Sequence, residues 1–230
     1  MRLLWIQAAQ DAGRGERGMT DGNPQYPKIL LCHPGADWAT ADIYDGVFNA
    51  LNKIGVPVVS YNLSGRIQAS GGFMKWWWNH RQRRGVDMPK YTPADVLFDA
   101  CQHIVTRALY FGVEWVVLIS GTYVPPQVLE MIRRAGLKIC TILTESPYQQ
   151  AQEIMLAHYS NVVFTNERTA VVDMAQYCNR NAYYWQHALD PAKHHPEERE
   201  GDVEGMDWLD VPGHDVVFIG TGWEERCDLL

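Results

Sequence analysis

Short apolar runs alternate with segments of helical periodicity along most of this chain, and this alternation limits the possible folds more than any other feature. The runs at 28–32 and 115–119 are continuous and apolar, which is the pattern of strands buried on both faces. Between strands, apolar residues recur at helical spacing, as from Ile43 to Ile54, and Gly55 is placed to end that helix. The order strand, helix, strand predicts an α/β fold, a Rossmann-like and mostly parallel sheet with helices on both faces. The expected strands span 28–32, 56–61, 115–119, 137–143, 161–165 and 182–186, and the expected helices span 43–54, 93–108, 126–134, 148–158 and 167–177.

Composition divides the chain into four parts. Residues 1–27 are rich in Gly, Arg, Asp and Pro without periodicity, which predicts a disordered leader. The regular alternation fills 28–190, and the proline-containing, acidic stretch 191–214 has the composition of a solvated linker. An apolar run and a Gly-rich turn follow at 215–230, so we expect the first strand and loop of a second, incomplete domain there.

Charge and cysteine usage limit the class of protein and its cellular compartment. The net charge of −7 argues against a general nucleic-acid-binding protein, because neutralising phosphates takes a surplus of Lys and Arg. The five cysteines form no C-x-x-C pair, which favours a reducing compartment. No stretch approaches the roughly 20 apolar residues of a transmembrane helix, so a cytoplasmic location is expected.

One segment, 76–84, combines three tryptophans with several arginines. Such a cluster could stack on bases or sugars, or contact a membrane surface. Alternatively, it is an amphipathic helix whose Trp side chains pack on the sheet. We favour the second interpretation, because Trp is usually largely buried.

Polar residues gather in the loops that follow the expected strands. In open parallel sheets ligands bind outside the carboxyl ends of the strands, and five of these loops carry His, Asp, Glu, Ser, Thr or Asn. Each loop alone has a plainer explanation, since turns and helix caps favour the same residues. Their convergence at one edge is what predicts a polar-substrate site. The candidate residues are His33, Asp37, Trp38, Ser120, Gly121, Thr122, Glu145, Asn166 and His187.

The run after the last expected strand contains Gly220-Thr221-Gly222. Backbone amides of such a turn can hold a phosphate at a helix N-terminus, although G-x-G alone is a weak signal. The sequence contains neither a Walker A motif nor a G-x-S-x-G elbow.

Four stretches together resemble the CgeB-like glycosyltransferases. The run 215–226 is similar to the opening strand and loop of that family's second domain, with Arg226 before a Leu-rich end. Upstream, 144–147 resembles the family's turn of an acid followed by Pro, 161–166 its strand end, and 186–191 the ending that precedes its linker. The likeness runs in order through about 28–230. Some tailed phages carry such enzymes, so a phage source, and with it the host cytoplasm, is expected.

The resemblance implies a GT-B enzyme in which the N-terminal domain binds an acceptor and the C-terminal domain binds a nucleotide-sugar. Mapped onto this sequence, Gly220, Thr221, Gly222 and Arg226 would begin the donor site. Asp37 and His33, with Glu145 next, are the candidate general bases, and general-base catalysis needs such a group within reach of the attacking hydroxyl. Trp38, Ser120, Gly121, Thr122, Asn166 and His187 would bind the acceptor. No metal and no cofactor beyond the nucleotide-sugar co-substrate is implied, in keeping with a sequence that lacks a D-x-D motif.

Most of the family's donor domain has no counterpart among these residues. We therefore expect the chain to be incomplete as an enzyme by itself, with a second chain as one source of the donor domain. The alternative is a non-catalytic Rossmann-like module that binds a nucleotide or a sugar. A nucleic-acid-binding role for the Trp- and Arg-rich segment is a third interpretation, which the net charge disfavours.

Overall fold

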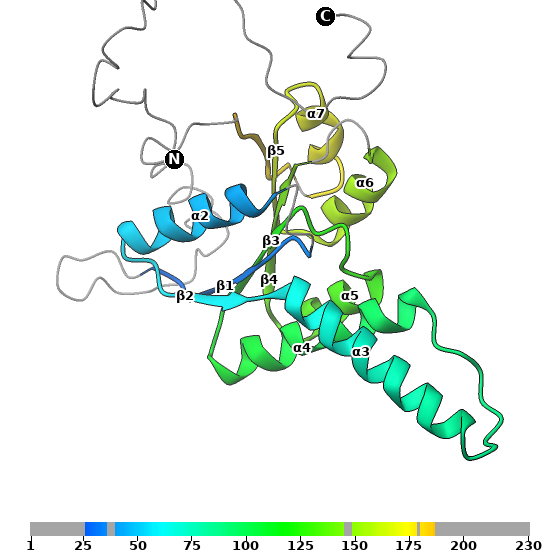
Figure 1. Cartoon of the computed structure of the whole chain (residues 1–230). Helices are drawn as coiled ribbons and strands as arrows, with labels where there is room; N and C mark the ends of the chain where they lie inside the picture. Colours follow the sequence, from blue (N-terminus) through cyan, green and yellow to red (C-terminus); the bar gives the residue numbers. More distant parts are fainter. Residues whose placement is uncertain (1–25, 36–39, 145–148, 179, 187–230) are drawn as a thin grey trace, which may run out of the picture. The chain divides into compact units, whose positions relative to one another are not determined.

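Six parallel strands form one sheet in the computed structural model of this chain, which describes residues 26–35, 40–144, 149–178 and 180–186 (Figure 1). The strand order across the sheet is β2-β1-β3-β4-β5-β6, and all five neighbouring pairs are parallel. The predicted Rossmann-like α/β fold is therefore confirmed. The strands are β1 (Ile29–Cys32), β2 (Val58–Tyr61), β3 (Trp115–Ile119), β4 (Lys138–Leu143), β5 (Val162–Thr165) and β6 (Ala182–Tyr184).

Successive residues of each strand turn to opposite faces of the sheet, as the strand period of two requires. In β1, Leu30 and Cys32 join the apolar cluster on one face, whereas Ile29 and Leu31 join the cluster on the other. All four side chains are at most 1% exposed. Because both faces are covered, the strand is continuously apolar rather than alternating, which is why the sequence run reads as it does.

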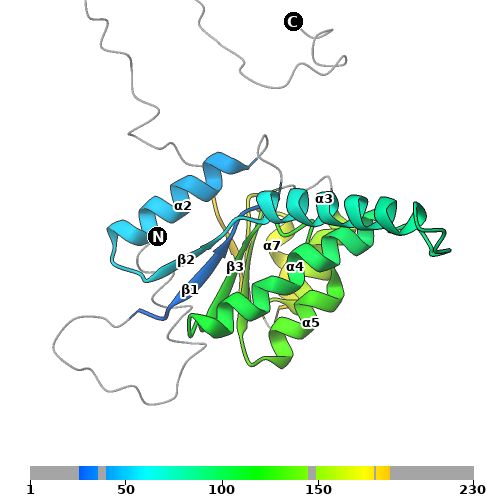
Figure 2. The same ribbon diagram turned by 60° about the horizontal axis from the view of Figure 1, so that its bottom comes forward.

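The helices lie in two layers around the sheet (Figures 1 and 2). On one face, α2 contributes Tyr44, Val47 and Leu51 to the apolar cluster. The helices α4 to α7 cover the other face and contribute buried residues such as Ile104 and Leu129. The helices are α2 (Ala41–Lys53), α3 (Leu63–Gln82), α4 (Pro93–Tyr110), α5 (Pro126–Arg134), α6 (Gln150–Tyr159) and α7 (Ala170–Ala175).

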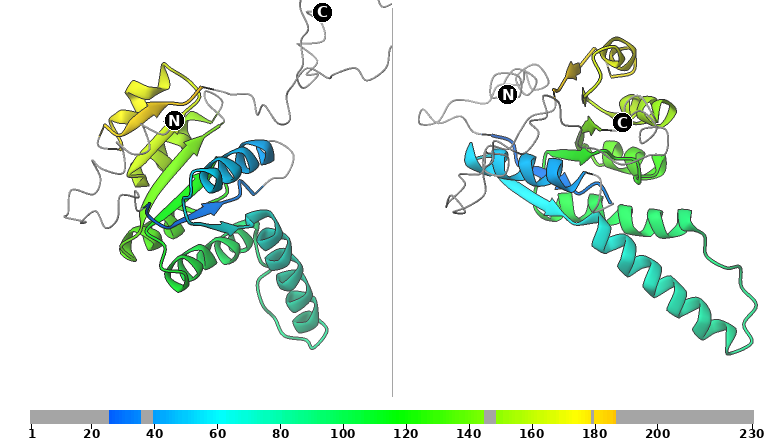
Figure 3. Two further views of the ribbon diagram at one scale, coloured as in Figure 1. Left: turned by 90° about the vertical axis from the view of Figure 1, so that its left-hand side faces the viewer. Right: turned by 45° about the horizontal axis from the view of Figure 1, so that its top comes forward.

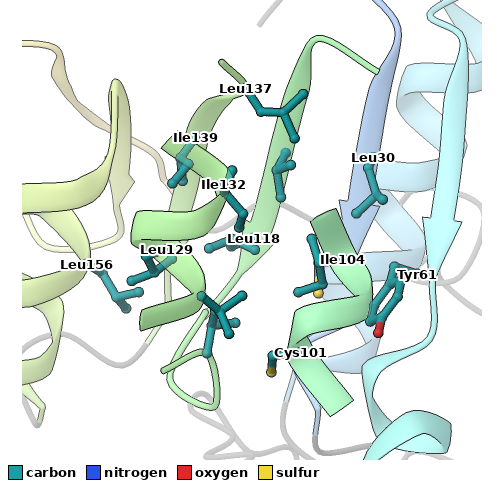
Figure 4. Packing of buried hydrophobic residues seen from close by; sticks show 14 of the residues in the cluster. Leu30, Tyr61, Cys101, Ile104, Leu118, Leu129, Ile132, Leu137, Ile139 and Leu156 are labelled. Atoms are coloured by element: carbon teal, nitrogen blue, oxygen red, sulfur yellow. The ribbon is translucent and has the colours of Figure 1, made fainter. Parts of the chain in front are cut away.

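The larger apolar cluster joins the centre of the sheet to α4, α5 and α6 (Figure 4). Leu118 of β3 and Ile104 of α4 are fully buried in it, and burial of such a side chain stabilises the fold by roughly 1.5–3 kcal/mol. Tyr61 at the end of β2 donates a hydrogen bond from its hydroxyl to the Ala100 carbonyl of α4. Burial raises the pKa of Tyr61, so the hydroxyl stays protonated and keeps this link between β2 and α4.

The expected start of α4 is confirmed in detail. Thr92 is the N-cap, Pro93 is the first helical residue, and Asp95 completes a reciprocal capping box with Thr92. The ends of β3 and α5 also fall at the residues that the sequence predicts.

Helix α3 is continuous for 20 residues and includes the three tryptophans of the segment 76–84. The expectation that its Trp side chains pack on the sheet is wrong for two of them, since Trp76 is 57% exposed and Trp77 is 40% exposed. The helix packs against α4 instead, through a side that includes Leu63 and Gly71. A Cβ on Gly71 would lie 3.6 Å from Val96, so the two helices approach closely there.

The predicted leader at 1–27 lies almost wholly outside the described residues, as do the linker at 191–214 and the further strand at 215–230. All three stay predictions. None of the helices in the described part is long and apolar enough to cross a membrane.

Candidate functional site at the carboxyl edge of the sheet

The direction of chain progress across the sheet reverses between β1 and β3. From β1 the chain moves outward to β2, whereas from β3 it moves the other way through β4, β5 and β6. In doubly wound sheets the loops that follow such a pair of strands diverge and leave a crevice in which ligands bind. Here these loops are 33–39, of which 33–35 is described, and 120–124. The described parts of these loops approach closely, because a Cβ on Gly35 would lie 2.9 Å from Cδ2 of Tyr123.

His33 follows β1 directly and is held by its neighbours. Its backbone N–H donates to the Tyr61 carbonyl at 2.9 Å, and its Nδ1 accepts a hydrogen bond from the Gly35 N–H at 3.3 Å. A neutral imidazole that accepts at Nδ1 carries its proton on Nε2. In this arrangement His33 is a hydrogen-bond donor through Nε2, and it can accept a proton at Nδ1 only by giving up the bond from Gly35.

Tyr44 of α2 supports the His33 ring. The two ring centroids are 5.1 Å apart and the planes meet at 60°, an edge-to-face contact. The Tyr44 hydroxyl is hydrogen-bonded to the Ser60 hydroxyl on β2. Burial raises the pKa of Tyr44, so the ring stays neutral and acts as an anchor for His33 rather than as a base.

The loop after β3 contains two consecutive left-handed residues. Ser120 has a φ of +61° and Gly121 a φ of +75°. For Ser this conformation costs roughly 1–2 kcal/mol, and the surrounding structure must hold it. Ser120 is 4% exposed, its N–H donates to the Ile142 carbonyl at 2.8 Å, and its hydroxyl lies 3.3 Å from that of Thr122. A non-glycine residue held in a strained conformation at a strand end is a reason to look for function there.

The same loop is tied to α6 through a residue that sequence analysis missed. The side-chain amide of Gln152 donates to the Thr122 carbonyl. The next residue, Glu153, is 1% exposed and is the one buried acid in the described ranges. An acid in the first turn of a helix ordinarily matches the helix dipole, so no signal in the sequence distinguished Glu153.

Asn166 lies at the end of β5 and joins it to the end of β4. Its amide nitrogen is 3.5 Å from the Thr144 carbonyl, which is at the long limit for a hydrogen bond. Parallel strands are about 4.8 Å apart, so the three strand spacings between β1 and β5 put Asn166 about 14 Å from the loop of His33. The neighbouring Glu167 is engaged locally, because hydrogen bonds from the Thr169 N–H and hydroxyl lower the pKa of its carboxyl.

The structure thus brings His33 beside the loop of Ser120, Gly121 and Thr122, at the carboxyl ends of β1 and β3, and it does not bring Asn166 there. The remaining predicted site residues lie outside the described residues, and their roles stay predictions. They are Asp37, Trp38, Glu145, His187, Gly220, Thr221, Gly222 and Arg226.

The described residues of these two loops carry neutral hydrogen-bonding side chains. Residues 33–35 and 120–124 include an imidazole and three hydroxyls, and Asp37 of the first loop lies outside the described residues. Pro125 and Pro126 at the start of α5 lack two of the N–H groups with which a helix N-terminus binds phosphate. The arrangement suits a ligand with many hydroxyl groups better than a phosphate. Among the residues that the structure describes, no three His, Cys, Asp or Glu side chains are grouped to hold a metal ion.

Comparison with known proteins adds no relative. The sequence matches no protein-family model, and no curated protein matches it.

Proposed function

We propose that this chain is the acceptor-side half of a glycosyltransferase of GT-B architecture, similar to the CgeB-like enzymes. It would transfer a sugar from a nucleotide-sugar to a hydroxyl group of an acceptor. One observation carries the proposal: the loops that follow β1 and β3 meet where the direction of the chain across the sheet reverses, and they carry neutral hydrogen-bonding side chains, His33 and Thr122, that suit a hydroxyl-rich ligand. The resemblance of the stretches at 144–147, 161–166, 186–191 and 215–226 to that family supports it. A phage source and a cytoplasmic location belong to the same proposal.

In the proposed reaction an acceptor hydroxyl attacks the anomeric carbon of the donor sugar. A bond forms between the acceptor oxygen and that carbon, the bond from the carbon to the phosphate oxygen breaks, and the nucleotide leaves with the electron pair. The hydroxyl proton passes to a general base, for which Asp37, His33 and Glu145 are the candidates. Ser120 and Thr122 would hold the acceptor, and Gly220, Thr221, Gly222 and Arg226 would begin the donor-phosphate site.

A non-catalytic binding module is the second candidate function. The observation in its favour concerns His33, the candidate base that the structure describes, because its Nδ1 already accepts a hydrogen bond from the Gly35 N–H. Such a module would bind a sugar or a nucleotide in the same crevice without transfer.

Two measurements separate these functions. Saturation-transfer NMR on the chain, with a panel of free sugars and nucleotides, reports binding. We expect sugar signals that weaken in Thr122→Val. The same signals should persist in Thr106→Val, a matched change on the exposed side of α4. Nucleotide release from nucleotide-sugars, measured with the chain alone and together with a protein that supplies a donor domain, reports transfer.

The transferase predicts turnover in the combined sample and a loss of roughly 100-fold or more in Asp37→Ala or His33→Ala, the usual contribution of a general base. Binding without turnover for every nucleotide-sugar and either sample would leave the binding module. Absence of both binding and turnover would contradict both functions.

A further inference from the structure

Helix α3 presents a row of aromatic rings to solvent. Successive members of the row are three, one and three positions apart, a spacing that puts them on one side of a helix. They are Phe73, Trp76, Trp77 and His80. Phe73 is 60% exposed, Trp76 57% and Trp77 40%. We call these four residues the aromatic face of α3.

Neighbouring rings of this face lie against one another, some tilted and some stacked. The planes of Phe73 and Trp76 meet at 36°, and those of Trp76 and Trp77 meet at 40°. Trp76 and His80 are stacked, with centroids 5.5 Å apart and planes within 17°, and Trp77 and His80 follow at 6.1 Å and 23°. The Arg81 guanidinium lies 5.5 Å from the centroid of the Trp77 ring. The helix therefore offers exposed, flat π-surfaces with a cation already beside one of them.

Positive charge is concentrated on the same part of the chain. Residues 63–91 contain six Lys or Arg residues and one acid, although the whole chain carries a net charge of −7. Figures 2 and 3 show that the outer part of α3 and the loop that joins it to α4 extend beyond the edge of the sheet. The six basic residues are Arg66, Lys75, Arg81, Arg83, Arg84 and Lys90.

We infer that the aromatic face of α3 binds single-stranded nucleic acid. Unpaired bases stack on aromatic side chains irrespective of sequence, and nearby Lys and Arg neutralise the phosphates. A duplex keeps its bases stacked within itself, so the exposed rings select a single strand. The net charge of −7 does not oppose binding here, because the basic residues are concentrated on one projecting element. The inference does not depend on the proposed glycosyl transfer.

Two other occupants fit the observations less well. A helix at a membrane surface inserts aliphatic as well as aromatic side chains, but Leu63, Ile67 and Met74 are buried or half-buried, while the exposed apolar residues of this face are all rings. A second copy of the chain, docked face to face, would bring two basic surfaces together. Both remain outcomes that the experiment can detect.

Fluorescence anisotropy of a labelled oligothymidylate of 12 nucleotides, titrated with the whole chain, tests the inference. We expect binding that is tighter than to a 12-base-pair duplex, and that weakens roughly 20-fold from 50 to 200 mM salt if three phosphates are neutralised. The double variant Trp76→Ala/Trp77→Ala should weaken binding roughly 5- to 150-fold for each stacked base that is lost.

Matched controls distinguish binding at the aromatic face of α3 from non-specific binding to exposed rings and charges elsewhere. Tyr110→Ala removes a ring that is 81% exposed at the other end of α4, and it should leave binding unchanged. Arg84→Glu should weaken binding more than Arg133→Glu, a change of equal charge on an exposed residue of α5.

Three results would overturn the inference. The first is equal binding by the wild type and the double Trp variant. The second is co-sedimentation with vesicles of anionic phosphatidylserine but no binding of the oligonucleotide. The third is Trp-dependent self-association in sedimentation velocity, again without oligonucleotide binding.

Discussion

Gly35 combines a φ of +95° with a close approach to Tyr123, and each feature alone disfavours a side chain. A Cβ at this position would lie 2.9 Å from Cδ2 of Tyr123 and 3.4 Å from Cδ1 of Ile67. The contact joins the loop after β1 to the loop after β3. The close approach of the two loops therefore depends on a residue without a side chain.

We expect Gly35→Ala to lower the free energy of unfolding by about 1–3 kcal/mol, because it adds both left-handed strain and a steric clash. Urea unfolding followed by circular dichroism measures the change. Gly46→Ala is the control, since Gly46 lies within α2 with no atom within 4 Å of an added Cβ. That variant should gain about 0.5–1 kcal/mol. If the free energy of unfolding changed equally in Gly35→Ala and Gly46→Ala, the clash at Gly35 would be relieved without loss of stability.

At the scale of single elements, α4 shows how a short signal places a helix. The Thr92 hydroxyl accepts a hydrogen bond from the Asp95 N–H, and the Asp95 carboxylate accepts one from the Thr92 N–H at 2.7 Å. Thr92→Ala should therefore destabilise the protein by about 1 kcal/mol in urea unfolding. Thr106→Ala, an exposed position in the middle of α4, should be neutral or slightly stabilising, because Ala is the better helix former. A loss of the same size in both variants would mean that the cap contributes nothing.

The same cap predicts a dependence on pH. Hydrogen bonds from the backbone and the hydroxyl of Thr92 lower the pKa of the Asp95 carboxyl. A carboxyl with a lowered pKa stabilises the folded state above its unfolded pKa of about 3.9, and this contribution disappears as the pH falls through the folded pKa. At pH 7 the wild type should therefore unfold at a higher urea concentration than Asp95→Asn. At pH 3 the difference between the two urea midpoints should be smaller. Asp87→Asn, which removes the same charge in the loop before α4, is the matched control. If the difference in urea midpoint between the wild type and Asp95→Asn were the same at both pH values, the charged cap would not be its source.

At the scale of the whole molecule, the sheet and its helices bury four thiols. Cys32, Cys101, Cys140 and Cys178 are free and buried, and they lie in β1, in α4, in β4 and in the turn after α7. Burial raises the pKa of the Cys101 thiol to about 12, and it raises the pKa values of the other three as well. A thiol reacts as its thiolate, so burial and the raised pKa protect these residues together.

We expect the four thiols to resist alkylation at pH 8 in the folded protein and to react together when urea unfolds it. Peptide mapping by mass spectrometry identifies each labelled cysteine. Val172→Cys, at a position that is 69% exposed, should react at once in the folded protein and serves as the positive control. Rapid labelling of one buried thiol alone would instead indicate local opening of the element that carries it.

Apart from the full extent of α3, the order and kind of the described elements are determined by the sequence itself. Strand β3 and helix α5 begin and end where their apolar patterns do, and the start of α4 follows from Thr92, Pro93 and Asp95. These signals are local, since each depends on residues within one or two turns of chain. The candidate crevice residues His33, Ser120 and Thr122 could be predicted for the same reason, because they directly follow apolar runs in a parallel sheet.

Only the tertiary structure decides which of these loops meet. The strand order puts β1 beside β3, so His33 shares a crevice with Ser120, and it puts Asn166 three strands away. Tertiary packing also decides the hydrogen bond from Gln152 to Thr122. It likewise decides the exposure of Trp76 and Trp77 on α3. Each depends on contacts between segments far apart in the chain, and the periodicity of a segment carries no information about the partner on which it packs.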